Sequence, residues 1–408
     1  MRIAIYDLRF TILFLCVALL LIVHAGCMAG DSSFGNHIGI NHPDKKVSPP
    51  VMAVYEGKIF ISYIREEEDV YLTVLSEDGK TLIAPAKIND KTSPANGIHQ
   101  NPGMAIGPNG EIYITWTSPR EGDEFAADIR FAVSMDSGKT FSPSIAVNDN
   151  TTSSSRGFES IATGKNGAVF VAWLDGREKK QGVSSAYFSR STDGGRTFEK
   201  NIKLDDNACP CCRTAAAAAD DGTIYVSWRK VFDGDIRDMV VAASKDNGRT
   251  FQQPAVVSRD QWAIQGCPHR GPSMDIDEKG VLYYSWYTEG SDGLPGIYLS
   301  ASKDGGKTFT SKESLPVGNR VFPDHPKLTV GKNGTVYLVW EEKTPVLSKI
   351  MFASYREGKG FSKPEQLSQG VRRSYEPVVS AGDDGTVYAA WGYDEIRFSK
   401  VIIRAMKP

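Results

Sequence analysis

Seven short segments of the chain alternate between apolar residues and other residues, and each begins with a glycine and ends with an aromatic residue. The segment GTIYVSW at 222–228 is an example. Alternation with a period of two predicts a β-strand with two different faces. The closing aromatic residues stand 51 to 58 residues apart and are Tyr63, Trp116, Trp173, Trp228, Trp286, Trp340 and Trp391. Seven copies at this spacing predict a repeat protein in which each unit is a small sheet.

A second repeated segment follows four of these strands. It reads SMDSGKTF from Ser134, STDGGRTF from Ser191, SKDNGRTF from Ser244 and SKDGGKTF from Ser302. The shared pattern is Ser-x-Asp-x-Gly-x-Thr-Phe. Aspartate can accept hydrogen bonds from nearby backbone N–H groups, glycine permits a positive φ, and phenylalanine can anchor the turn in an apolar layer. Each copy therefore predicts a tight turn between two strands, and none of its residues predicts chemistry.

This turn pattern resembles the Asp-box, or BNR repeat, of the sialidase-like β-propellers. In that family the boxes mark architecture and lie away from the catalytic face. We therefore predict an all-β fold, a single seven-bladed β-propeller of four-stranded antiparallel blades at 34–404. The six-bladed fold of true sialidases is the alternative. Residues 34–41 match 141–148 at Phe, Ile and Asn, so we expect this N-terminal strand to complete the last blade and close the ring.

The N-terminus has a different composition. Two arginines precede an uninterrupted apolar run at 12–23, which has the order and length of a signal-peptide core. Cys27 follows two small residues, as in the lipobox of bacterial lipoproteins. We predict a lipoprotein-type signal peptide at 1–26, a short tether at 27–33 and a lipid on Cys27. Cleavage near Ala29 without lipidation is the alternative. Either reading predicts export, to the periplasm or the cell surface, and the first adds membrane contact through the lipid alone.

Charge argues against two classes of partner. The chain of 408 residues is 41% hydrophobic and 24% charged, its formal net charge is −2, and no long run of one sign occurs. Nucleic acids and anionic membrane surfaces attract strongly basic patches, and this sequence provides none.

The chemistry is expected at one mouth of the central channel. In a propeller the segments that lead into the innermost strands converge there. Aligning the units on their aromatic strands brings together a set of mostly ionisable residues, namely His99, Gln100, Arg156, Glu159, 209–213, 267–270, Asp324, His325, Arg372, Arg373, Tyr375 and Glu376.

Two cysteine motifs align at this mouth. When Trp228 is set against Trp286, CPCCR at 209–213 matches CPHR at 267–270. An even number of cysteines in an exported protein favours disulfides, and we prefer a bridge from Cys209 or Cys211 to Cys267. The alternative is a zinc or copper ion held by thiolates and a histidine; no other cofactor is expected. The residues concerned are Cys209, Cys211, Cys212, Cys267 and His269.

The resemblance to sialidases also implies a catalytic site. That family holds its substrate carboxylate with three arginines and uses a tyrosine nucleophile, a glutamate that activates it and an aspartate as acid/base. The place of the first arginine reads VSPP at 47–50, so that arginine is missing. The matching candidates are Tyr375 as nucleophile, Glu376 or Glu159 as its activator, and Asp175 as acid/base. The candidate anion-binding residues are Arg156, Arg177, Arg213, Arg270 and Arg372. The alternatives are structural: a salt bridge between Asp175 and Arg177, and a packed Tyr375.

Three functions remain open from the sequence. The first is an exported propeller that binds an acidic glycan or related ligand at the channel mouth and hydrolyses its glycosidic bond as a sialidase does. The second is a non-catalytic scaffold that holds another envelope protein, which the missing arginine and the seventh blade favour. The third is a thiol or metal site at the two cysteine motifs. Fold alone does not choose among them.

Overall fold

The computed structural model describes residues 37–40, 45–96, 100–178, 182–318, 320–370, 372–396 and 399–407. The signal peptide at 1–26, the tether at 27–33, the lipid on Cys27 and the candidate His99 lie outside the described residues. These assignments stay predictions. Among the described residues, no helix has the length and apolar character that crossing a membrane requires.

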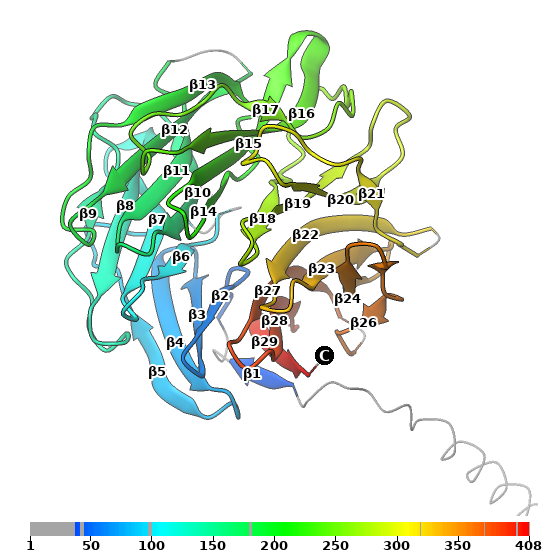
Figure 1. Ribbon diagram of the computed structural model, residues 1–408. Helices are drawn as coiled ribbons and strands as arrows, with labels where there is room; N and C mark the ends of the chain where they lie inside the picture. Colours follow the sequence, from blue (N-terminus) through cyan, green and yellow to red (C-terminus); the bar gives the residue numbers. More distant parts are fainter. Residues whose placement is uncertain are drawn as a thin grey trace, which may run out of the picture.

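The described part of the chain is all-β, as predicted, and contains no α-helix. It forms five small sheets and one larger sheet arranged around a central axis (Figure 1). The first sheet contains β2 (Val51–Tyr55), β3 (Lys58–Arg65), β4 (Asp69–Ser76) and β5 (Thr81–Lys87). The second contains β6 (Gly103–Ile106), β7 (Ile112–Arg120), β8 (Asp123–Ser134) and β9 (Ile145–Ala146).

The larger sheet contains the strands of two repeat units. They are β10 (Arg156–Thr163), β11 (Val169–Asp175), β12 (Ser184–Ser191) and β13 (Ile202–Ala208), then β14 (Ala215–Ala218), β15 (Ile224–Phe232), β16 (Ile236–Ser244) and β17 (Ala255–Val256). A short 3-10 turn, Asp233–Asp235, separates β15 from β16. The two halves are joined by a single residue pair, Ala208 of β13 opposite Lys230 of β15. The third and fourth units therefore share one sheet, and the structure contains six sheets for seven predicted units.

The remaining strands form three sheets. One contains β18 (Ser273–Ile276), β19 (Leu282–Thr288), β20 (Gly296–Ser302) and β21 (Glu313–Ser314). The next contains β22 (Phe322–Val330), β23 (Val336–Lys343), β24 (Ser348–Arg356), β25 (Gly360–Phe361) and β26 (Glu365–Gln366). The last contains β27 (Ser374–Ala381), β28 (Val387–Asp394), β29 (Ser399–Met406) and β1 (Ile38–Ile40). In the last sheet Ile38 lies opposite Ile403, so the two ends of the described chain pair. The seven-blade count and the closure of the ring stay predictions.

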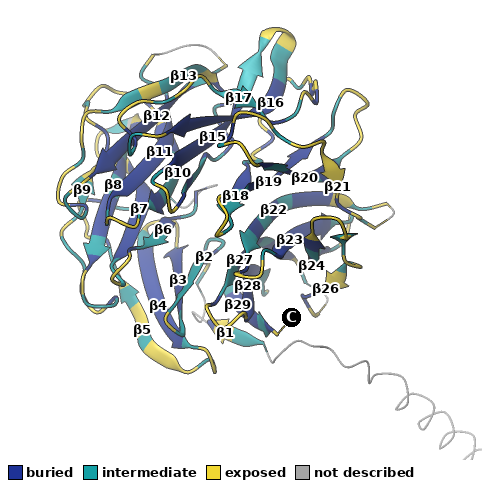
Figure 2. Ribbon diagram, in the orientation of Figure 1, coloured by how far each residue is buried: buried dark blue, intermediate teal, exposed yellow. Residues whose placement is uncertain are grey.

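The aromatic residues that close the repeated strands lie in the core. All six repeat tryptophans and Tyr63 are almost completely buried. Trp286, for example, packs with Leu282 of its own strand and with Tyr225 and Val241 of the neighbouring unit. The middle strands of the sheets are accordingly the most buried elements (Figure 2). Each large aromatic side chain fills the space between two units, which is the packing role that its spacing predicts.

The four Ser-x-Asp-x-Gly-x-Thr-Phe turns form the same hydrogen bonds. In the first, the Ser134 hydroxyl donates to Asp136 at 2.8 Å, and Asp136 accepts the backbone N–H of Thr140 at 2.9 Å. Gly138 has a φ of 94°, which an L side chain rarely adopts. The bonds from Thr140 lower the pKa of Asp136 to about 2. None of the residues of these turns lines the central cavity.

Candidate functional site

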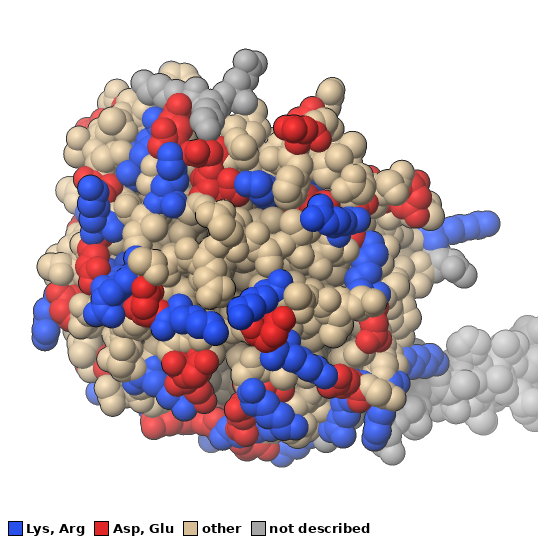
Figure 3. Space-filling view, turned by 45° about the horizontal axis from the view of Figure 1, so that its top comes forward, with Lys and Arg blue, Asp and Glu red and all other residues tan. Residues whose placement is uncertain are grey.

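A cavity of about 480 Å³ lies at the centre of the ring, between the innermost strands and the segments that lead into them. Every repeat unit contributes to its wall. The charged and titratable residues that line it include Glu159, Arg213, His269, Arg270, Asp324, His325, Lys327, Lys343, Arg373 and Glu376. Charges of both signs are interspersed over the face in Figure 3. The alignment on aromatic strands thus brought part of the wall together, but Arg156, Arg372 and Tyr375 do not line this cavity, and Lys327 and Lys343 were not in the aligned set.

Three of the wall segments share a strained backbone. Phe158, His325 and Glu376 have φ values of 56°, 46° and 45°. Each stands fifteen residues before the tryptophan of its unit. Each also lies in an irregularity of the pairing between β10 and β11, β22 and β23, or β27 and β28. A β-bulge interrupts the alternation of side chains and re-aims one of them, at a cost of about 1–3 kcal/mol for a non-glycine residue in this region. The strained backbone conformations therefore occur at equivalent positions of three units, and the residues at these positions border the cavity.

Two cations in the cavity wall have no carboxylate partner. The Arg213 guanidinium donates to the backbone carbonyls of Glu159 at 2.5 Å and Asn101 at 2.9 Å. Burial, followed by the charge of Arg213, lowers the pKa of Lys327 to about 8, although the charge of Glu376 opposes this shift. Within the described ranges, neither Arg213 nor Lys327 forms an ion pair. Two cations without an ion pair beside one cavity, of which Lys327 feels the charge of Glu376 only from beyond ion-pair distance, make that part of the wall attractive to an anion.

Two other cations on this wall, Arg270 and Lys343, are neutralised by one carboxylate, whereas Arg373 packs over the Tyr375 ring. Arg270 forms a bidentate pair with Asp324, with N–O distances of 2.6 and 3.1 Å, and Lys343 lies 2.7 Å from the same carboxylate. Burial opposes the ionisation of Asp324, but His325, Arg270 and Lys343 lower its pKa far below 3.8. His325 Nδ1 lies 3.1 Å from Glu341 Oε2. Burial lowers the pKa of His325, yet the bond to Glu341 and the nearby Asp324 raise it overall.

Three of the predicted sialidase-type residues form a closed ion-pair cluster outside the cavity. Asp175 Oδ2 accepts from Arg156 Nε at 3.0 Å and from Arg177 Nη2 at 2.8 Å. The side chains of Arg156 and Asp175 are fully buried. Burial raises the pKa of Asp175, but the bonds from Arg177, Arg156 and Trp173 lower it overall. The arrangement matches the structural alternative, a salt bridge between Asp175 and Arg177.

Tyr375 and Glu376 share a second cavity, and only Glu376 also lines the central one. Glu376 lines the central cavity, and its carboxylate accepts from Asn101 Nδ2 at 3.3 Å. Tyr375 lines a second cavity of about 530 Å³ that lies against β28 and that Glu376 also borders. Burial, followed by the charge of Asp394, raises the pKa of the Tyr375 hydroxyl well above 10.

The two remaining candidates of this set differ in position. Glu159 lines the central cavity, and one of its carboxylate oxygens accepts from the Thr117 hydroxyl at 2.9 Å. Its other oxygen is buried and has no hydrogen-bond partner. Arg372 lies 3.7 Å from Glu395, and it does not line the central cavity. Of the two, only Glu159 belongs to the cavity wall, and it is completely buried there.

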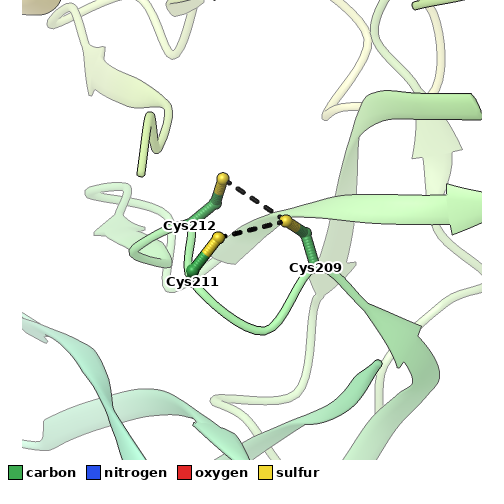
Figure 4. A group of neighbouring side chains, drawn as sticks. All are labelled: Cys209, Cys211 and Cys212. Atoms are coloured by element: carbon green, nitrogen blue, oxygen red, sulfur yellow. Dashed lines mark hydrogen bonds between the residues drawn. The ribbon is translucent and has the colours of Figure 1, made fainter. Parts of the chain in front are cut away.

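The predicted disulfide is not formed: Cys209, Cys211, Cys212 and Cys267 are all free thiols. Cys209 Sγ lies 3.7 Å from Cys211 Sγ and 3.5 Å from Cys212 Sγ (Figure 4), whereas a disulfide requires about 2.05 Å. The CPCC motif folds back on itself and buries its three thiols together, while Cys267 is exposed. The ligand atoms of Cys211, Cys267 and His269 also lie within 4.8 Å of one another. The two motifs therefore meet at Cys211, as their alignment predicts.

No family model matches this sequence, and no curated protein matches it. Several solved structures have a similar fold. Polysaccharide lyase Uly1 has a TM-score of 0.59 and 12% identity over 92% of this chain and 99% of its own. A protein of unknown function from Dyadobacter fermentans has a TM-score of 0.55 and 16% identity over 78% and 96%. The Hadza microbial sialidase Hz136 has a TM-score of 0.52 and 17% identity over 85% and 73%. These likenesses show that the fold is a sialidase-like β-propeller, as the sequence predicts.

Proposed function

We propose that this protein binds an acidic glycan in the central channel. The observation that carries the proposal is the pair of cations, Arg213 and Lys327, that form no ion pair among the described residues and lie in the wall of the central cavity. Two of the structures with a similar fold are named a sialidase and a polysaccharide lyase, which supports a glycan as the class of ligand.

The chemistry of the wall fits an oligosaccharide that carries a carboxylate or a sulfate. Arg213 is held by two backbone carbonyls, so its position is fixed before the ligand arrives, and a guanidinium matches a planar carboxylate. Lys327, with a pKa of about 8, carries a second positive charge at pH 7, and a bound anion favours this protonated form further. The carboxylate of Glu376, which is only partly buried, accepts hydrogen bonds from sugar hydroxyl groups. A sugar acid carries one negative charge and several hydroxyl groups, and a site that binds it needs a partner for each kind of group.

The test is a binding assay with matched acidic and neutral oligosaccharides. We expect trigalacturonate or 3′-sialyllactose, but not lactose, to bind in a calorimetric titration. Arg213→Gln and Lys327→Met should each weaken binding by roughly tenfold or more, because each removes a charge-assisted contact of about 1.5–3 kcal/mol. Lys332→Met is the matched control, because Lys332 forms an exposed ion pair with Asp383 and does not line the cavity. Equal binding of lactose, no binding of any acidic sugar, or unchanged affinity in both variants would refute the proposal.

Sialidase-type hydrolysis stays a finer prediction, with Tyr375 as nucleophile, Glu376 or Glu159 as activator and Asp175 as acid/base. The geometry supports recognition better than hydrolysis, because Asp175 is enclosed in ion pairs and burial disfavours ionisation of Tyr375. The discriminating measurement is turnover of a fluorogenic sialoside. The catalytic assignment is supported if the wild type hydrolyses the sialoside and Tyr375→Phe folds but is inactive. Full activity in Tyr375→Phe excludes the assignment.

A non-catalytic scaffold that binds another envelope protein is the second candidate. The observation that favours it is the segment 47–50, where the first arginine of the sialidase pattern would stand. Val47 lies there instead, buried, and its N–H donates to Ser399 Oγ at 2.8 Å. If the protein is a scaffold, we expect one defined protein to co-purify with the wild type. Neither neutral nor acidic sugars should displace that partner.

We propose further that the ring has seven blades and that β1 closes it. The innermost strands support this count, since β2, β6, β10, β14, β18, β22 and β27 contact one another in that order and β27 contacts β2. Deletion of 34–41 should lower the melting temperature and promote association through the β29 edge. A monomer with an unchanged melting temperature would contradict closure of the ring by β1.

Export with a lipid on Cys27 is tested by mass spectrometry of the mature N-terminus. An unmodified peptide that starts beyond Cys27 excludes the lipid.

A further inference from the structure

The loop between β13 and β14 gathers three thiols behind the channel wall. Cys209, Cys211 and Cys212 are all buried, and their sulfur atoms lie within 4.8 Å of one another. In Figure 4, Cys209 projects from the end of the strand toward Cys211 and Cys212, which stand on the following loop. Exposed or isolated cysteines need no explanation, but three buried thiols that converge on one point do.

The distances between the sulfur atoms fit a metal-bound state. A metal–thiolate bond of about 2.3 Å in a three-coordinate, planar arrangement places two sulfur atoms about 4 Å apart. The observed separations from Cys209 Sγ are 3.7 Å to Cys211 and 3.5 Å to Cys212. A small outward movement of the thiolates would admit an ion, whereas a disulfide would need one pair to close to about 2.05 Å.

Two buried arginines supply an independent argument. Arg237 Nη1 donates to Cys209 Sγ at 3.2 Å. Arg229 is almost fully buried, and its guanidinium donates to three backbone carbonyls, those of Arg237, Arg270 and Tyr287, at 3.0, 3.1 and 2.8 Å. In the part of the chain that the structure describes, neither arginine forms an ion pair.

A buried guanidinium without a carboxylate at ion-pair distance needs a negative charge elsewhere in its surroundings. Asp238 attracts Arg229 from beyond ion-pair distance, and its carboxylate accepts backbone N–H groups instead. A metal ion bound by three thiolates carries net negative charge at the required place. Arg237 also donates to the carbonyl of Gly266 and Arg229 packs over the Trp262 ring, and a bound thiolate on Cys209 would add a negative charge directly beside Arg237.

A second group of ligands connects this cluster to solvent. Cys211 belongs to both groups, since its sulfur also lies within 4.8 Å of the ligand atoms of Cys267 and His269. Cys267 and His269 are exposed, and His269 and Cys211 line the central cavity. His269 has a φ of 55°, which is a strained conformation for a residue other than glycine, and it lines the central cavity. The outer pair is thus placed to receive an ion from the channel and pass it to the buried thiols through the shared Cys211.

We propose that Cys209, Cys211 and Cys212 bind one copper(I) ion, which enters and leaves through Cys267 and His269. Copper fits better than zinc, because structural zinc takes four ligands and the inner group of described residues offers three. Thiolates are soft ligands and select copper(I). Binding exchanges the three thiol protons for the ion and involves no change of oxidation state, so no oxidant or reductant takes part.

The test uses the full protein, reduced and kept free of oxygen, titrated with copper(I) against the chelator bathocuproine disulfonate. We expect about one copper(I) ion per chain to be withheld from the chelator, with X-ray absorption showing about three sulfur neighbours near 2.3 Å. Cys212→Ala should lose the ion. Cys267→Ser and His269→Ala should keep it but transfer it to the chelator roughly tenfold more slowly.

Several results would overturn the proposal. They are a wild-type protein that yields all its copper to the chelator, one that retains zinc in preference to copper, and an absorption spectrum with one or two sulfur neighbours. The absorption measurement on the wild type keeps the test valid if Cys212→Ala does not fold. Metal binding is measured without a sugar, so failure here is separate from failure of the proposed glycan binding.

Discussion

Asp324 is the carboxylate on which the charge balance of the channel wall depends. It neutralises Arg270 through two N–O contacts of 2.6 and 3.1 Å and Lys343 through a third of 2.7 Å. The substitution Asp324→Asn keeps the shape of the side chain and removes its charge. Arg270 would then lose its ion pair, and Lys343 would keep only its longer contact of 3.6 Å with Glu341, on the same wall as Arg213 and Lys327.

The expected loss of stability follows from the burial of the three groups. Removing one partner of a fully buried pair costs about 3–5 kcal/mol. The side chain of Asp324 is only 3% exposed, but Arg270 and Lys343 are 23% and 31% exposed and can recover part of their hydration. We therefore expect Asp324→Asn to lower the free energy of unfolding by about 2–3 kcal/mol at pH 7. The partners hold the pKa of Asp324 below 3.8, so its contribution should shrink as the pH falls below that value.

Urea denaturation followed by tryptophan fluorescence measures this difference. Asp383→Asn is the matched control, because Asp383 and Lys332 form a 3.0 Å ion pair with side chains 69% and 60% exposed. Such a surface pair contributes about 0–1 kcal/mol. If Asp324→Asn costs no more than Asp383→Asn, the pairing of the channel cations is energetically unimportant and the reasoning fails.

Three further outcomes are expected. Raising the pH from 7 to 9 should weaken the binding of trigalacturonate roughly tenfold, because Lys327 has a pKa of about 8 in the free protein and loses its proton; Lys327→Arg should remove most of this dependence in calorimetry. Burial raises the pKa of Asp193, but bonds from Thr197 lower it to about 2, so Asp193→Asn should flatten the loss of thermal stability between pH 4 and pH 2. Gly248→Ala should destabilise the fold more than Gly222→Ala, although both glycines have a φ near 80°. The reason is that a Cβ at 248 would lie 2.8 Å from a ring atom of Phe188, whereas a Cβ at 222 would meet no atom within 4 Å.

The fold was predictable because its signal is local and repeated. The alternation in GTIYVSW at 222–228 locates β15, Ile224–Phe232, and the closing Trp228 is buried as expected. The number of sheets was not predictable in the same way. The third and fourth units merge through one pair, Ala208 and Lys230, and a single backbone contact leaves no trace in the hydrophobic pattern.

The site was predictable in position but not in the direction of its side chains. Alignment on the aromatic strands brought Arg213, Arg270 and Glu376 to the cavity wall, and the structure places them there. The same alignment brought in Arg156, whose side chain turns outward to Asp175. Alternation normally settles such a choice, but the left-handed residues of the wall segments break it. Propensity does not predict a left-handed phenylalanine or glutamate, such as Phe158 or Glu376.

The two cysteine motifs and the two cavity arginines belong to the same short segments. Arg213 directly follows Cys212, and Arg270 directly follows His269. Whatever fixes the backbone of the first motif also fixes the guanidinium that reaches the carbonyls of Glu159 and Asn101. A thiol cluster behind the wall is therefore a means of holding Arg213 rigidly in a segment that the sheet does not support, since β14 begins only at Ala215. Loss of sugar affinity in a cysteine variant would then report a displaced arginine, and it is not by itself a sign that sulfur contacts the ligand.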